Sequence, residues 1–275
     1  MSSREKLFSY GRSRTRMLLP DLLLATALLI LIYMTAWWLV GTLAKDNSLV
    51  DIAWGPGFIL VAWFLLLLSG TTTAAQVLLT VLITIWGTRL AIHIGARKLD
   101  TDEDWRYAAM RKKWGKHALW RSYFQVYLLQ GLLLLIISLP FLVVNSAYPQ
   151  LGLHPLVVIG FLVWLKGFWW ETVADWQLSA FKADGKNKGK LMTHGVWRYS
   201  RHPNYFGESL QWWGFALIAL SVAGGWIALL SPLLLTGLLV GVSGVPLLEK
   251  RYEHRKDWQA YKAKTSAFIP WLPRK

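Results

Sequence analysis

Cysteine is absent from this chain of 275 residues. Its absence excludes disulfide bonds, zinc sites with thiolate ligands and thiol nucleophiles. Acidic residues are scarce as well: 15 Asp and Glu residues stand against 30 Lys and Arg residues, a formal net charge of +15. Only 16% of the residues are charged, whereas 55% are hydrophobic, more than is usual for a soluble domain. The composition therefore favours a membrane protein.

The surplus of positive charge has two possible explanations. A strongly basic chain can bind nucleic acid. Here, however, the basic residues lie in short stretches between long apolar runs, where cationic loops face lipid headgroups. We therefore expect contact with membrane lipid and no nucleic-acid partner. Because no soluble domain fits outside the apolar runs, residues 1–275 are expected to form a single integral membrane domain.

Seven apolar runs are long enough to span a bilayer, which takes about 20 helical residues. They fall near 17–43, 49–69, 73–95, 122–146, 151–177, 205–223 and 225–248. These runs predict an all-α fold, a polytopic membrane helix bundle of about seven transmembrane helices. The first run follows a basic N-terminal segment, 1–16, but continues past Trp38 without a small-residue cleavage pattern, so we expect it to be retained in the membrane.

Lys and Arg in the connections indicate the orientation of the bundle. The third connection, 97–121, the fifth, 182–201, and the tail 249–275 are rich in them, whereas the second, fourth and sixth have almost none. The positive-inside rule places the basic connections and the C-terminus in the cytoplasm. With seven spans the N-terminus would lie outside, although segment 1–16 is also basic.

The stretch WRYSRHPNYFGE, Trp197 to Glu208, gathers basic and aromatic residues at the start of an apolar run. Pro203 lacks an N–H group and disfavours helical backbone at His202, so a helix should begin there. Asn204 and Glu208 then lie one turn apart on one face. The stretch is either a basic interfacial cap with snorkelling arginines or a site for an anionic, partly aromatic cofactor at the mouth of the bundle.

Two more polar stripes lie inside apolar runs. Arg89 and His93 are four residues apart, and an arginine this deep in a run should point into the bundle and meet a carboxylate or a phosphate. Glu171 and Asp175 have the same spacing, and two such carboxylates repel unless a cation or donor lies between them. Arg89, Arg198 or the donor groups of a ligand could fill that role.

Other features concern single helices. Asp51, at the edge of the second run, is costly there unless it is paired or lines a polar cavity. The Gly-Pro-Gly sequence at 55–57 is expected to break or kink the same helix. Close contact with a neighbouring helix is expected at Gly237, Gly241 and Gly244 of the seventh run.

Two connections have compositions of their own. The sequence TDEDWRYAAMRKKWGKHALWRS mixes charges with aromatics, which is typical of an amphipathic helix in the membrane interface, with an acidic start at 102–104. The sequence FKADGKNKGK is rich in glycine and lysine and can surround phosphates with ammonium groups and backbone N–H groups.

The motif RYSRHPNYFGE, preceded by Asp175 and Lys182 and followed by a tail of the form Y…Y…FIP, resembles the steroid 5-alpha-reductase-like membrane enzymes, in particular the bacterial branch catalogued as a domain of unknown function. The similarity extends from VDIAWG through nearly the whole chain. Its shorter core, R-H-P-x-Y-x-G-E, is also similar to isoprenylcysteine carboxyl methyltransferases, which bind S-adenosylmethionine. The resemblance implies an integral protein of the bacterial inner membrane.

The polar fifth run, the DGKNKGK loop and the short sixth connection favour the reductase branch. That branch implies NADPH, bound in a cavity that opens to the cytoplasm, and a lipophilic, steroid- or lipid-like substrate with a carbon–carbon double bond conjugated to a carbonyl. The expected cofactor contacts are Glu171, Asp175, Lys182, Arg198, Tyr199, Arg201, His202, Asn204, Tyr205, Glu208 and Tyr252. No GxGxxG motif is present, so no Rossmann domain is expected, and the histidines lack the spacing of metal ligands.

The catalytic candidates are Asp51, Trp86 and Arg89. Reduction of such a bond needs a donor to the carbonyl oxygen, where negative charge develops, and a proton for the α-carbon. In the steroid reductases that the chain resembles, a Gln–Glu pair on the second helix and a tyrosine on the third address that oxygen. This chain has Val50 with Asp51, and Trp86, at those positions. Because an indole N–H donates a hydrogen bond but is no acid, this departure argues against a 3-oxosteroid substrate.

Two other functions remain open: S-adenosylmethionine-dependent methylation of a lipid or prenylated substrate, and a non-catalytic role in membrane binding or assembly. A site surrounded by lysine and arginine suits an anionic dinucleotide better than a cationic sulfonium. The non-catalytic alternative predicts that Asp175, Asn204 and Glu208 do not converge.

Overall fold

The computed structural model describes residues 17–98, 101–147 and 154–274, so the basic segment 1–16 lies outside the described residues. In this part of the chain the regular elements are helices, and extended pairing is limited to one bridge between Ser200 and Ser266. The all-α prediction is thus confirmed. The helices are α1 Leu19–Leu43, α2 Val50–Leu68, α3 Ala74–Lys98, α4 Trp105–Trp114, α5 Ala118–Ser122, α6 Leu129–Ile137, α7 Leu139–Ser146, α8 Pro155–Ala183, α9 Pro203–Ala219, α10 Leu230–Gly241, α11 Val245–Tyr252 and α12 Lys256–Lys264.

Six helical stretches among the described residues are long and apolar enough to cross a membrane. They are Leu19–Leu43, Asn47–Leu68, Ala74–Lys98, Trp105–Ile137, Pro155–Ala183 and Gly225–Tyr252. The remaining expected segment, 205–223, forms α9, which has 17 residues and is shorter than these six. The predicted membrane bundle is confirmed, but the count of seven is not.

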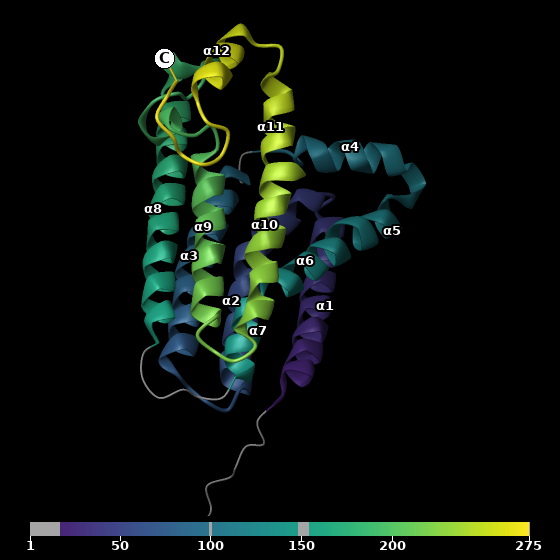
Figure 1. Ribbon diagram of the computed structural model, residues 1–275. Coiled ribbons are helices and arrows are strands. Elements are labelled where there is room, and N and C mark those ends of the chain that lie inside the picture. The colour runs from purple at the N-terminus through teal and green to yellow at the C-terminus, as the bar shows by residue number, and fades with distance from the viewer. Residues whose placement is uncertain (1–16, 99–100, 148–153, 275) are drawn as a thin grey trace, which may run out of the picture.

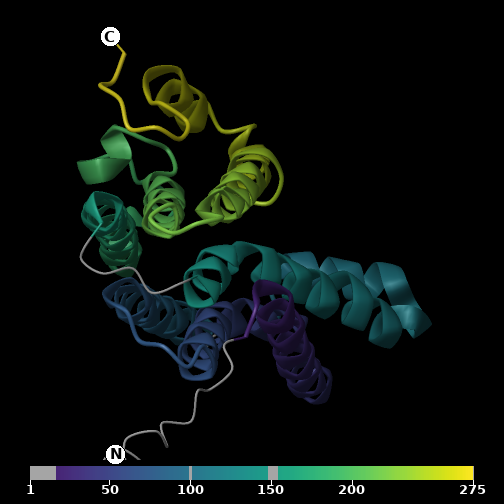
Figure 2. The same cartoon turned by 60° about the horizontal axis from the view of Figure 1, so that its bottom comes forward.

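The bundle has two groups of helices. Helix α9 packs between α8 and α10, while α2 packs on α3 and α1 packs on α2. Helices α4 and α5 leave this bundle as a hairpin that projects sideways, and α6 and α7 bring the chain back (Figures 1 and 2). The C-terminal part, from α11 onward, lies at the same end of the bundle as α4 (Figure 1).

The Gly-Pro-Gly sequence was predicted to break or kink this helix, and it does not break α2. Pro56 lies inside a helix that continues from Val50 to Leu68. The flanking glycine has a packing role, because a Cβ atom at Gly55 would collide with the carbonyl group of Gly87 on α3. The glycines therefore let two helices approach closely, which is a frequent use of small residues in membrane bundles.

The closest approach of α8 and α9 also depends on glycines. A Cβ atom at Gly167 would lie 2.6 Å from the carbonyl oxygen of Gly207, and one at Gly160 would lie 2.6 Å from that of Gly214. The glycines of the seventh run were predicted to permit such a contact. No atom of a described residue lies within 4 Å of a Cβ atom built at Gly237 or Gly241, and the nearest atoms to one built at Gly244 belong to Leu239, five residues earlier in the chain. That prediction was wrong, because glycine in an apolar run does not tell whether a partner helix lies opposite.

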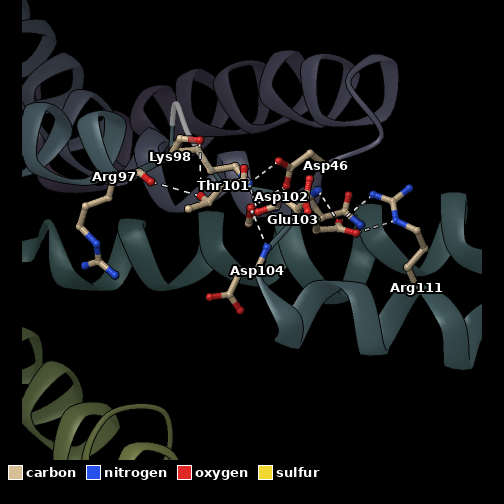
Figure 3. Close-up of polar contacts among 10 residues, drawn as sticks. Asp46, Arg97, Lys98, Thr101, Asp102, Glu103, Asp104 and Arg111 are labelled. Carbon is tan, nitrogen blue, oxygen red and sulfur yellow. Dashed lines mark hydrogen bonds and ion pairs between the residues drawn. The ribbon is translucent and has the colours of Figure 1, made fainter. Parts of the chain in front are cut away.

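Polar contacts fix the end of α3 and the start of α4 against the turn that precedes α2 (Figure 3). The Lys98 ammonium lies 2.6 Å from the Asp46 carboxylate, and Glu103 accepts a hydrogen bond of 2.8 Å from the backbone N–H of Asn47. Glu103 also forms a 2.8 Å ion pair with Arg111 on α4. Burial opposes ionisation of Asp46, but the Lys98 ammonium and hydrogen bonds from Ser48 outweigh it and hold the pKa of this carboxyl below its usual value.

The segment after α12 runs beside the stretch that leads into α9. The N–H of Arg201 donates to the carbonyl of Ser266 at 2.8 Å, and the N–H of Trp271 donates to the carbonyl of Tyr199 at 2.9 Å. The Ser200 hydroxyl adds a 2.8 Å bond to the carbonyl of Phe268. The FIPW sequence at 268–271 is therefore docked against the start of α9.

Candidate functional site

A network of buried polar groups joins α3, α8 and α9. Arg89 lies between the two carboxylates of α8: Nη1 is 2.8 Å from Glu171 Oε1, and Nη2 is 2.5 Å from Asp175 Oδ2. Trp86, one turn away from Arg89, donates its indole N–H to Glu171 Oε2 at 3.0 Å. His93 Nε2 lies 3.9 Å from Asp175 Oδ2. The guanidinium of Arg89 therefore supplies the cation that the repulsion between Glu171 and Asp175 was expected to require.

Helix α9 contributes the other side of the network. Pro203 is its first residue, as predicted, and Asn204 in the first turn donates to Asp175 Oδ1 at 3.2 Å. Two turns further, Gln211 donates to Glu171 Oε2 at 2.5 Å. Asn204, Glu208 and Gln211 recur at helical spacing and share one face of α9. Asp175 and Asn204 therefore converge, which the non-catalytic alternative did not predict.

Three groups near this network keep unused hydrogen-bonding capacity within the described part of the chain. Gln211 Oε1 and Trp212 Nε1 are buried without a hydrogen-bond partner. The carboxyl group of Glu208 is close to Glu171 and Asp175 but makes no hydrogen bond to a described residue. Unused buried groups of this kind are costly unless a water or ligand completes them. Glu208 and Gln211 Oε1 are acceptors and Trp212 Nε1 is a donor. A primary carboxamide has two N–H donors and one carbonyl acceptor, so these residues fit the carboxamide of the nicotinamide in NADPH.

A second polar cluster surrounds Asp51, between α2, α4 and α6. The Tyr107 hydroxyl donates to Asp51 Oδ1 at 2.7 Å, and Arg106 Nη2 donates to Oδ2 at 3.1 Å. Gln130 donates to the Tyr107 hydroxyl at 3.3 Å and accepts from the indole N–H of Trp54. Asp51 is therefore paired, one of the two conditions under which an acid is tolerated at the edge of a span. It lies apart from Trp86 and Arg89, so the three catalytic candidates do not form one group.

Aromatic side chains fill the space between the two polar clusters. Phe58 lies 5.5 Å from Trp54, 5.9 Å from Trp86 and 5.3 Å from Trp212, measured between ring centroids. Tyr205 on α9 is near Arg106 of the second cluster and near Glu208 and Asp175 of the first. Packed aromatic side chains thus lie between the two clusters.

Arg201 and His202 have structural partners instead of facing the carboxylate network. Arg201 Nε lies 2.8 Å from Glu249 Oε1, and its Nη1 donates to the carbonyl of Thr265 at 2.5 Å. His202 Nε2 lies 3.4 Å from Glu249 Oε1, and its ring stacks on Tyr205 at 5.6 Å. Both side chains are buried, so they tie the start of α9 to the C-terminal segment.

The other expected cofactor residues lie around the same end of the bundle. Lys182 is in the last turn of α8, and Arg198 is exposed just before Tyr199. Tyr252 packs on Trp258 at 5.4 Å, and Arg255 lies over its ring, so it belongs to the C-terminal region. A hollow of about 410 Å³ on this part of the molecule is lined by Trp170, Tyr199, Pro270, Trp271 and Leu272. Its walls are apolar, and Tyr199 is the one expected NADPH-binding residue among those that line it.

Sequence reasoning missed Arg106, Tyr107 and Gln130 as site residues. Arg106 and Tyr107 were assigned to an interfacial helix, and Gln130 to packing between helices. The available signal was Asp51 itself, since an acid in an apolar run needs a cation or a donor. The first tyrosine after Asp51 in the sequence was Tyr107, and Arg106 lies beside it.

These features define an all-helical integral membrane protein with one buried polar cluster and one half-buried polar cluster. A family model described as "Protein of unknown function (DUF1295)" matches residues 37–265, and the chain belongs to this family. The expected resemblance is thus confirmed at the level of the family.

Individual relatives match shorter stretches. The chain is 35% identical to mouse "3-oxo-5-alpha-steroid 4-dehydrogenase 1" over 71 residues, which are 26% of this chain and 28% of that protein. It is 34% identical to the human protein of the same name over 83 residues, 30% of this chain and 32% of that protein. A cotton (Gossypium hirsutum) protein, "Steroid 5-alpha-reductase DET2", is 34% identical over 65 residues, 24% of this chain and 25% of that protein. The chain thus aligns with less than a third of each relative's length, and no solved structure matches it.

Proposed function

We propose that this protein is a membrane reductase that uses NADPH to reduce a carbon–carbon double bond conjugated to a carbonyl in a lipophilic substrate. The observation that carries the proposal is the convergence of Asn204, Glu208 and Gln211 on the Glu171–Asp175 pair, with acceptor groups left unused. The partial likeness to proteins named as steroid reductases supports the same reaction class. The proposal places the basic end of the bundle in the cytoplasm of a bacterial cell, where NADPH is available.

The network around Glu171 would hold the nicotinamide end of the cofactor. When bound, the cofactor supplies the hydride. Glu208 and Gln211 Oε1 accept hydrogen bonds from a carboxamide, while Asn204 is held in place by Asp175. Trp86 and Arg89 act as positioning residues, since their donor groups are already bound to Glu171 and Asp175.

The phosphate end of the cofactor would lie toward the cationic side chains outside this network. Lys182 at the end of α8, the lysines of the 184–190 loop and Arg198 are available there. Gly189, in this loop, has a φ of 81° and accepts a hydrogen bond from Arg255, so the loop has a defined conformation against the C-terminal region. Ammonium groups and turn N–H groups are suitable partners for phosphates.

The cluster around Asp51 would address the substrate carbonyl. Arg106 uses Nη2 for Asp51 and Nε for Asp104, which leaves Nη1 without a hydrogen bond to any residue that the structure describes. A fixed guanidinium donor stabilises the negative charge that develops on the carbonyl oxygen during reduction. Asp51 and Tyr107 hold Arg106 in place and can pass a proton through their hydrogen bond.

Thermal unfolding of the detergent-solubilised protein tests the cofactor directly. A ligand that binds only the folded protein raises its apparent stability. We expect NADPH to raise the unfolding temperature and S-adenosylmethionine to leave it unchanged, with NADH as the test of nucleotide choice. Loss of nicotinamide absorbance with enone lipids would then identify the reaction. A rise with S-adenosylmethionine alone would refute the proposal and favour a methyltransferase.

A further inference from the structure

The α4–α5 hairpin has few contacts with the rest of the bundle. Helix α4 packs on α5 and on the short turn Asn47–Leu49, and both views show the hairpin extending away from the other helices (Figures 1 and 2). Gly115, at the tip, has a φ of 51°, which a residue with a side chain rarely adopts. The two helices thus form a compact arm with most of its surface outside the bundle.

The unpaired charges on this arm are all positive. Asp104 and Glu103, at its base, are paired with Arg106 and Arg111. Toward the tip, Lys112, Lys113, Lys116 and Arg121 are exposed, and none forms an ion pair within the described part of the chain. The arm therefore carries four uncompensated cations.

Apolar side chains are exposed on the same arm. Trp105 is 56% exposed, Trp120 is 66% exposed and Phe124 is 55% exposed, and the last two stack on each other. Large aromatic groups next to lysine and arginine are typical of helices that lie at a bilayer surface, with the rings at the level of the headgroups.

We propose that the α4–α5 hairpin is a binding surface for anionic phospholipids in the leaflet at its end of the bundle. Lys112, Lys113, Lys116 and Arg121 contact the phosphates, while Trp105 and Trp120 enter the headgroup layer. Anionic lipid is the occupant that matches both the charge and the exposed rings. None of these six side chains belongs to either polar cluster, so they can be changed without altering a residue of the proposed reaction.

The absence of cysteine allows a direct test in the full-length protein. The variant His117→Cys places a single thiol at the exposed tip for a fluorescent label. The labelled protein is reconstituted in phosphatidylcholine vesicles that contain a spin-labelled lipid, either phosphatidylglycerol or phosphatidylcholine. We expect the phosphatidylglycerol probe to quench the label several-fold more strongly at equal content.

A variant with Lys112, Lys113, Lys116 and Arg121 all changed to Gln should lose this preference. The matched control removes the same charge from the same end of the molecule by changing Lys250, Lys256, Lys264 and Arg274 to Gln, and it should keep the preference. Equal quenching by both lipids, no quenching by either, or equal loss in the control would each overturn the proposal. Thermal unfolding confirms that both variants are folded.

Discussion

The guanidinium of Arg89 lies between two carboxylates on successive turns of one helix, 2.8 Å from Glu171 and 2.5 Å from Asp175. Breaking a buried pair of this kind leaves an uncompensated charge. We expect Arg89→Met to lower the free energy of unfolding by roughly 3–5 kcal/mol, measured by denaturant titration in detergent. Arg89→Lys should also destabilise, because an ammonium does not reproduce the planar fork.

The exposed pair Arg255–Asp257 provides the control for that experiment. Exposed ion pairs contribute little to stability because water already solvates both partners. Asp257→Asn, at the exposed carboxylate of this pair, should therefore leave the unfolding curve almost unchanged. A similar loss in Arg89→Met and Asp257→Asn would contradict a buried role for Arg89.

We expect Glu208→Gln to weaken NADPH binding by roughly tenfold or more, the effect of losing a hydrogen bond to a charged group. The fold should not depend on this carboxyl, because no described residue forms a hydrogen bond with it. Binding is measured by titration of the purified protein, with thermal unfolding in parallel. Glu253→Gln, at an exposed position after α11, is the matched control. An unchanged Kd in the Glu208 variant would remove Glu208 from the site.

Asp51→Asn should lower kcat and leave the affinity for NADPH unchanged. The reason is that Asp51 binds Arg106 and Tyr107 in the second cluster and has no contact with the Glu171 network. Asparagine retains the shape but weakens the hold on the guanidinium. Steady-state kinetics with an enone lipid, together with a separate NADPH titration, would distinguish the two effects. Weaker NADPH binding at normal kcat would contradict the proposal, because it would place Asp51 at the cofactor and not at the substrate carbonyl.

Gly167→Ala should destabilise the bundle by about 1–3 kcal/mol, the usual cost of overpacking. Its Cβ atom would lie 2.6 Å from the carbonyl oxygen of Gly207, and backbone on both helices would have to shift. Gly237→Ala is the control, since no atom lies within 4 Å of the added carbon. It should be neutral or stabilising, because alanine is the better helix former. Comparable destabilisation of the two variants would argue against a close α8–α9 contact.

The Asp46–Lys98 pair should make stability depend on pH. The pKa of Asp46 is lower in the folded protein than in the unfolded chain, so its contribution is present above the unfolded value and is lost as the pH falls through the folded value. Asp46→Asn should therefore lower the unfolding temperature at neutral pH, and the difference from the native protein should vanish in acid. Thermal scans of both proteins over a pH series measure this. A constant difference across the series would exclude the ion pair as its cause.

Local spacing predicted the parts of the site that depend on one helix at a time. The i, i+4 pairs on α3 and α8 and the helix start at Pro203 follow from backbone geometry, so Arg89, Glu171 and Asp175 were expected to face the interior. The sequence did not decide whether the partner of Arg89 is a carboxylate or a phosphate, because one helix does not specify which helix lies next to it.

Contacts between distant segments could not be predicted in this way. Arg201 and His202 lie in a basic, aromatic stretch that suggested cofactor contacts, but Glu249, their partner, is nearly fifty residues further along the chain. Tyr107 was assigned to the membrane surface because the position of α4 beside α2 depends on the contacts of Glu103 with Asn47, 56 residues earlier in the chain, and with Arg111. The glycine contacts were missed for the same reason, since a glycine in an apolar run has no visible partner in the sequence.

The pairing of 199–201 with 266–271 has a consequence for biosynthesis. Tyr199 and Arg201 bond to Trp271 and Ser266 through the backbone, and Arg201 is held further by the carbonyl of Thr265. The entry to α9 therefore cannot take its final form until the ribosome has released residues 265–271, which are made after α9. Until then residues 199–201, just before α9, lack their contacts with the C-terminal segment.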